Sequence, residues 1–89
     1  MKYIVFAWND DDAELGYKFV RVEADTPEKA VELSMVSIYS DMLEKGYEED
    51  ECDYFQEHAS FAPITEEQLA NRTIEQFFQE EIAINRTMQ

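Results

Sequence analysis

Basic residues are scarce in this sequence, and their scarcity argues against direct binding of nucleic acid. Seven lysines and arginines stand against 21 aspartates and glutamates, so the formal net charge is −14. Contacts to phosphate groups need clusters of Lys and Arg, and no such cluster is present. The same negative charge repels anionic membranes and attracts basic surfaces. We therefore expect a partner with a basic surface, and no direct contact with nucleic acid or membrane.

Cysteine, glycine and long apolar runs are scarce as well. The single cysteine, Cys52, excludes an internal disulfide framework. With only Gly16 and Gly46, the chain has no glycine-rich loop that would cradle a phosphate group. No apolar run approaches the length of a membrane span, and the apolar start at residues 1–8 is too short for a signal peptide. These absences predict a soluble protein of a reducing cytoplasm.

The chain does contain enough apolar side chain to fold. Hydrophobic residues make up 45% of the sequence and aromatic residues 13%, whereas disordered acidic tails are poor in aromatics. Its 89 residues suffice for one modest core. We therefore expect one small α+β domain over residues 1–89.

Two strands are predicted near the N-terminus. Lys2–Trp8 is rich in aromatic and β-branched residues, and because both of its faces are apolar it should be central or covered on both sides. Tyr17–Ala24 alternates between apolar and polar positions. The acidic segment 9–16 joins the two, with Gly16 able to adopt positive φ. The expected result is an antiparallel hairpin.

A long helix is predicted over residues 25–46. Thr26 or Asp25 caps its start, Pro27 suits its first turn, and Gly46 ends it. Apolar residues at three- and four-residue steps mark the face that should lie on the sheet: Val31, Met35, Ile38 and Met42. We expect the hairpin and this helix to share one core, made of Ile4, Phe6, Val20, Val22, Val31, Met35 and Ile38.

In the last third of the chain, the sequence predicts a strand followed by one or two helices. Residues 54–64 can supply a third strand, which Pro63 ends or places at a sheet edge. Thr65 and Thr73 each begin a capping-box pattern. Either one helix runs from Glu66 with a break near Asn71, or two short helices follow one another.

The second capping box opens a helix with an aromatic face. Its apolar residues are Ile74, Phe77, Phe78 and Ile82. Because Phe77 and Phe78 are adjacent, we expect one in the core and the other at its rim.

No constellation of residues typical of catalysis or metal binding is recognisable. Cys52 and His58 are too few for a structural zinc site, and the acids around Cys52 should raise the pKa of its thiol, which opposes a nucleophilic role. A calcium loop that starts at Asp10 would need Gly and Glu where Leu15 and Arg21 stand. We therefore expect no enzyme, no catalytic residues, no metal and no cofactor.

The acids are distributed unevenly, and this unevenness points to function. Residues 46–71 hold eight acids and no Lys or Arg, whereas a surface adapted for solubility alone intersperses both signs. A merely solvated acidic face stays the alternative. Aromatic residues among the acids would anchor a contact. The candidate partner-binding residues are Asp10, Asp11, Asp12, Glu28, Glu32, Glu48, Glu49, Asp50, Glu51, Asp53, Tyr54 and Phe55.

In its size, its charge of −14 and its acid-rich stretches Asp10–Glu14 and Glu48–Asp53, the chain resembles small acidic phage-encoded inhibitors that imitate nucleic acid. This class includes anti-restriction and anti-CRISPR proteins. The resemblance implies a protein in the host cytoplasm whose carboxylates occupy the DNA or RNA site of a basic nucleic-acid-binding host protein, such as a defence nuclease complex.

A second resemblance is local. Val20–Ala30, a strand that leads into a "DTPEKA" helix start, is similar to HicB-type antitoxins with a partial ribonuclease-H-like fold, although their usual glycine-containing segment before this helix is missing. This similarity implies the alternative function, an antitoxin-like or structural module for protein–protein interaction without nucleic-acid mimicry. A homodimer is compatible with either function.

Overall fold

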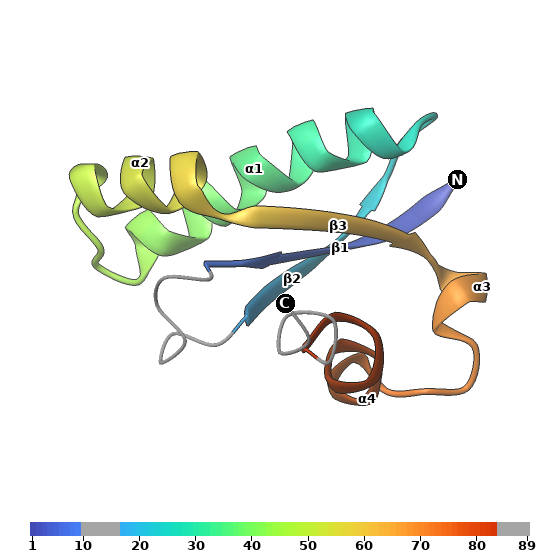
Figure 1. Ribbon diagram of the computed structural model, residues 1–89. Helices are drawn as coiled ribbons and strands as arrows, with labels where there is room; N and C mark the ends of the chain where they lie inside the picture. The colour runs from blue at the N-terminus through green and yellow to red at the C-terminus, as the bar shows by residue number, and fades with distance from the viewer. Residues whose placement is uncertain (10–16, 84–89) are drawn as a thin grey trace.

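Three layers make up the fold: two helices, a three-stranded sheet, and a set of short helices (Figure 1). The computed structural model describes residues 1–9 and 17–83. Its strands are β1 (Lys2–Trp8), β2 (Tyr17–Glu23) and β3 (Ser60–Thr65). The helices over one face of the sheet are α1 (Pro27–Glu44) and α2 (Glu49–His58). The other face is covered by α3 (Glu66–Leu69), α4 (Ile74–Phe77) and the π-helical segment η2 (Phe78–Ala83).

The sheet is antiparallel throughout, with the strand order β2-β1-β3. In the hairpin, Lys2 pairs with Glu23 and Trp8 with Tyr17. The predicted α+β class, the hairpin and the central place of β1 are confirmed. Pro63 lies on an edge strand, as expected, because proline cannot donate a ladder hydrogen bond. The predicted role of Gly16 lies outside the described residues.

Both faces of β1 are buried, so the protein has an apolar layer on each side of the sheet. Ile4 and Phe6 pack against the short helices, in a cluster with Ile64, Leu69, Phe77, Phe78 and Ile82. Val5 and Ala7 face α1 and α2. The prediction that Ile4 and Phe6 share one core with the α1 residues is therefore wrong. Successive side chains of a strand point to opposite faces, and an apolar pattern on both faces does not tell which one the long helix covers.

α1 begins and ends where its capping residues predict. The Thr26 hydroxyl accepts a hydrogen bond from the Lys29 backbone N–H at 3.1 Å, and Gly46 follows the helix with φ +94°. The buried face of α1 consists of Ala30, Ser34, Ile38 and Met42. Val31 and Met35, predicted for this face, are only partly buried. The small side chains of Ala30 and Ser34 let the helix approach the sheet closely, and the Ser34 hydroxyl donates to the Val31 carbonyl at 2.7 Å.

α2 is the element that the sequence prediction missed. Residues 54–58, predicted to begin the third strand, belong to this helix, and β3 begins only at Ser60. Two physical reasons favour the helix. Acids in its first turn interact well with the positive end of the helix dipole. Cys52 and Phe55, three residues apart, both point into the core, where they pack with Ala7, Ile38 and Met42.

Both predicted capping boxes are present, and they open two short helices in series. The Thr65 and Thr73 hydroxyls accept hydrogen bonds from the N–H groups of Gln68 and Gln76, at 3.2 and 3.1 Å. Each glutamine side chain in turn accepts from the backbone N–H of its threonine. Four orphan helix donors are thus satisfied locally.

Phe77 and Phe78 are both buried, at 7% and 4% exposure, so the expectation that one would lie at the rim is wrong. At this point α4 passes into the π-helical segment η2, and the wider turn of a π-helix reduces the angle between consecutive side chains. The Phe77 ring stacks on Phe6 at 5.7 Å, and the Phe78 ring stacks on Tyr17 at 4.1 Å.

Candidate functional site: the acidic helix and its cavity

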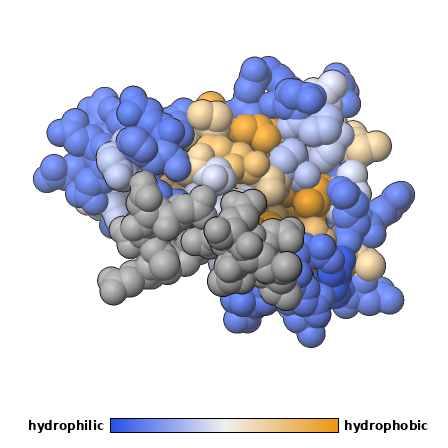
Figure 2. Space-filling model, in the orientation of Figure 1, coloured by the Kyte–Doolittle hydropathy of each residue, from blue (hydrophilic) through white to orange (hydrophobic). Residues whose placement is uncertain are grey.

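α2 carries most of the acidic stretch on a docked helix. Glu48 is its N-cap residue, and all six acids from Glu48 to Glu57 are exposed. Cys52 and Phe55, at 1% and 6% exposure, fix the helix to the sheet and to α1. Figure 2 shows hydrophilic residues over the end of the molecule where α2 lies, next to a more hydrophobic middle. The acids therefore project from a folded scaffold.

The helical repeat sorts these acids into an outer row and two flanks. Asp50, Asp53 and Glu57 follow each other at three- and four-residue steps, so they share the outward face with Tyr54. Along the helix axis they stand about 4.5 and 6 Å apart. Glu49 and Glu51 lie on the flanks of this row. Such like-charge spacing weakens a helix slightly.

One member of the row also lies near α1. Partial burial raises the pKa of Tyr39, on α1, above its ordinary value, and the nearby Asp53 carboxylate raises it further. The acidic row of α2 therefore reaches the side of α1 that carries Tyr39.

A cavity of about 300 Å³ opens beside α2. It is lined by Asn9, Met42, Tyr47, Asp50, Glu51, Tyr54 and Phe55. The Lys18 Nζ atom lies 5.8 Å from the ring centroids of both Tyr47 and Phe55. The Tyr54 ring, 52% exposed, lies 4.2 Å from the His58 ring. The cavity thus combines two carboxylates with three aromatic rings.

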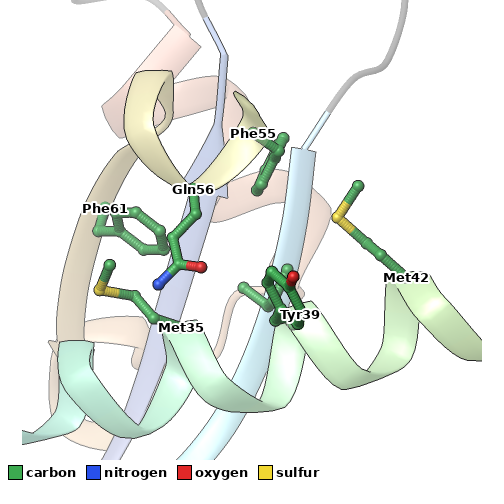
Figure 3. Close-up of a pocket in the computed structure, with 7 residues that line it drawn as sticks. Met35, Tyr39, Met42, Phe55, Gln56 and Phe61 are labelled. Atoms are coloured by element: carbon green, nitrogen blue, oxygen red, sulfur yellow. The ribbon is translucent and has the colours of Figure 1, made fainter. Parts of the chain in front are cut away.

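The seam between α1 and α2 is a separate feature and holds little space. It is lined by Met35, Ile38, Tyr39, Met42, Phe55, Gln56 and Phe61, and Figure 3 shows these side chains converging from both helices and β3. Its volume is about 10 Å³, which is about the space of one water molecule. It is a packing seam between two helices.

The structure brings only some of the predicted site residues together. Asp50, Glu51, Tyr54 and Phe55 line the cavity, and Glu48, Glu49 and Asp53 stand on the same helix. Phe55 is buried, however, so its ring forms a wall and is not free to anchor a partner. Asp10, Asp11 and Asp12 lie outside the described residues.

Glu28 and Glu32 stand apart from this group. Both are exposed near the start of α1, whereas α2 lies beside the other end of α1 (Figure 1). Lys29 lies between them in sequence, and its Nζ is 3.3 Å from a Glu32 carboxylate oxygen. This part of the predicted surface is therefore partly neutralised and separate from the cavity.

The candidate residues predicted from the sequence do not include Asn9, Lys18, Met42 or Tyr47. A helical spacing could have indicated Tyr47. Three- and four-residue steps lead from Tyr47 to Asp50 and Glu51 and on to Tyr54. Lys18 and Asn9 come from the hairpin, and only the folded chain brings them near α2.

The thiol and the imidazole on α2 point in different directions. Cys52 is buried and His58 is exposed. Burial raises the pKa of the Cys52 thiol, and the nearby carboxylates of Asp53, Glu51 and Glu49 raise it further. The predicted direction of this shift is confirmed, with burial as the larger cause. Within residues 1–9 and 17–83, no three or more His, Cys, Asp or Glu side chains are placed to hold a metal ion.

Comparisons with known proteins find no match among protein-family models, curated proteins or solved structures. In the described part of the chain, no helix is both long and apolar enough to cross a membrane. The geometry of α2 and its cavity is therefore the basis for the functional argument.

Proposed function

We propose that this protein is a non-enzymatic acidic inhibitor that binds a basic nucleic-acid-binding protein and occupies its DNA or RNA site. The observation that supports this proposal is the exposure of six carboxylates on one docked helix, in a segment of 26 residues that has no Lys or Arg. Repulsion among these like charges weakens the helix unless a cationic surface faces them.

The spacing of the carboxylates suits a surface that normally binds phosphates. Asp50, Asp53 and Glu57 stand about 4.5 and 6 Å apart along the helix axis. This is the same order as the axial rise of about 3.4 Å between phosphates of one DNA strand. Lys and Arg side chains are long enough to adjust to the difference. A row of carboxylates can therefore compete for the cations of a nucleic-acid site.

The docking of α2 should add to the affinity. Cys52 and Phe55 hold the helix in place before any partner arrives, so binding orders fewer residues than it would in a flexible acidic peptide. Charge steering should make association fast, and salt should weaken it because exposed charges are screened over about 8–10 Å.

A capture experiment with matched variants tests this proposal. The protein is immobilised, exposed to host lysate, and eluted with a salt gradient, and the eluted protein is identified by mass. Asp50→Asn, Glu51→Gln and Glu57→Gln are combined in one variant, and Glu23→Gln, Glu67→Gln and Glu75→Gln in a control of equal net charge. These six residues are all exposed, and the control residues lie on β2, α3 and α4.

We expect a basic nucleic-acid-binding protein that the control variant retains and the α2 variant loses. Equal retention by both variants would contradict a role of α2. If every captured protein stayed bound at high salt, the proposal that binding is electrostatic would be contradicted as a whole.

The alternative function, a structural interaction module, is favoured by a different observation on α1. Residues 33–40 carry no charge, and Leu33, Val36 and Leu43 are exposed at 39%, 68% and 44%. Their spacing places them on one stripe of the helix. The fitting occupant is the α1 helix of a second copy in antiparallel orientation. In this arrangement the uncharged middle of one α1 helix faces the uncharged middle of the other. At most other places the acidic surfaces of two copies would repel each other.

The ends of this stripe also fit a second copy. In the antiparallel arrangement, Lys29 of one copy approaches Glu44 of the other, while Asp41 is already paired with Lys45 of its own helix at 2.9 Å. We expect concentration-dependent dimers by analytical ultracentrifugation that Val36→Glu abolishes and the control Glu23→Gln retains. A protein that is monomeric at all concentrations would contradict this alternative.

A further inference from the structure

The cavity beside α2 has the chemistry of a site for a cationic side chain, and we propose that it takes the guanidinium group of an arginine on the partner protein. This inference rests on the proposed function, because it names the group that the partner would insert. The observations that carry it are the composition of the cavity walls, its size, and the position of one lysine of the chain itself.

The walls supply both kinds of attraction that a desolvated cation needs. Asp50 and Glu51 are the acidic residues of the lining. Tyr47, Tyr54 and Phe55 contribute aromatic rings, whose faces are negative and attract cations within about 6 Å. Met42 and Phe55, both buried, provide apolar wall for the methylene stem of a long basic side chain. The proposed site is therefore more than a cluster of acids.

The chain's own Lys18 already places an ammonium group near two of these rings. Its Nζ lies 5.8 Å from the Tyr47 ring and 5.8 Å from the Phe55 ring, although Lys18 does not line the cavity. This cation at the edge of the site has a testable consequence. It competes with an incoming cation for the same two rings and repels it, so its removal should strengthen binding.

The geometry favours arginine over lysine. Tyr54 lines the cavity and is 52% exposed, and because the His58 ring lies 4.2 Å from its ring, a planar group would use the opposite face of Tyr54. A guanidinium stacks on such a face while donating paired hydrogen bonds to a carboxylate, here Asp50 or Glu51, and it is less strongly hydrated than an ammonium. A volume of about 300 Å³ lies at the lower end of ligand sites and suits one side chain.

Titration of the full-length protein with small probes tests the inference without any partner. The probes are N-acetyl-arginine amide, N-acetyl-lysine amide, and N-acetyl-citrulline amide, which has nearly the shape of arginine without its charge. Amide chemical shifts in ¹⁵N-labelled protein report the place and strength of binding. We expect arginine to shift the amides of Tyr47, Asp50, Glu51 and Tyr54, lysine to bind more weakly, and citrulline not to bind.

Matched variants separate the cavity from the general negative charge. Tyr54→Leu and Asp50→Asn should each weaken arginine binding roughly fivefold. Lys18→Gln should strengthen it, whereas Lys29→Gln, with the same change in net charge on exposed α1, should leave it unchanged. Shifts spread evenly over exposed acids such as Glu23 and Glu67, or equal effects of the two lysine variants, would overturn the inference.

The outcomes distinguish failure of this site from failure of the proposed function. If arginine does not bind in the cavity but the α2 carboxylates still displace nucleic acid from a partner, only the inference fails. If arginine binds in the cavity but the protein displaces no nucleic acid, the proposed inhibition fails and the site stands.

Discussion

Two variants of identical composition should differ in stability, because they change the charge at opposite ends of α2. Glu49→Lys places a cation in the first helical turn, and Glu57→Lys places one in the last turn. Each variant has a net charge of −12, since one acid of the −14 chain becomes a base. A model in which only the total charge matters predicts equal stabilities for the two variants.

The helix dipole makes the two substitutions unequal. An acid near the N-terminus or a cation near the C-terminus contributes about 0.3–1 kcal/mol at low salt. Glu49→Lys loses one favourable charge at the dipole and gains an unfavourable one, whereas Glu57→Lys loses an unfavourable charge and gains a favourable one. Each new lysine stands four residues from Asp53 and exchanges a repulsion for an attraction of about 0.2–0.5 kcal/mol, so this contribution largely cancels between the two variants. We expect Glu57→Lys to be more stable than Glu49→Lys by about 2 kcal/mol.

Thermal unfolding followed by circular dichroism at low salt measures this difference. In a domain of this size, about 2 kcal/mol corresponds to about 8–16 °C in melting temperature. The difference should shrink at high salt, because salt screens exposed charges. Equal melting temperatures at low salt would refute the reasoning, because they would mean that residues 49–58 do not form a helix with this polarity.

Two further predictions concern the core under α2. Phe55→Ala should lower the free energy of unfolding by about 3–5 kcal/mol in urea, because Phe55 is only 6% exposed. Tyr54→Ala, at an exposed position, should change it by about 0.5 kcal/mol or less. Similar effects of the two variants would contradict the assignment of Phe55 to the buried face of α2. The raised pKa of the buried Cys52 thiol contributes stability that is fully present below the unfolded thiol value of about 8.5 and is lost as pH rises through the folded value. Wild type should therefore lose more stability between pH 7 and pH 10 than Cys52→Ala, and equal losses would show that the thiol is not protected.

Features that depend on interactions between residues close in sequence were predicted correctly. Thr26, Thr65 and Thr73 each accept the predicted hydrogen bond at a helix start, because a capping residue and its donor lie within three residues. The antiparallel pairing of the two N-terminal strands was likewise predicted from their composition and their closeness in sequence. These features need no knowledge of the rest of the fold.

Features that depend on tertiary contacts were predicted less well. The apolar faces of β1 contain no information about which face α1 covers, so Ile4 and Phe6 were assigned to the wrong layer. In α2 the acidic composition concealed two buried anchors, Cys52 and Phe55, whose partners lie on β1 and α1. The cavity could not be predicted from the sequence for the same reason, since its walls join Asn9, which follows β1, with residues of α1 and α2.

Competition with nucleic acid tests the central claim most directly. Once a partner has been captured, its labelled DNA or RNA is bound to it, and fluorescence anisotropy is followed while this protein is added. We expect full displacement at about one equivalent near physiological salt, and no displacement by the variant that combines Asp50→Asn, Glu51→Gln and Glu57→Gln. A partner that is saturated with this protein and still binds its nucleic acid with unchanged affinity would contradict the claim that the carboxylates of α2 occupy the nucleic-acid site.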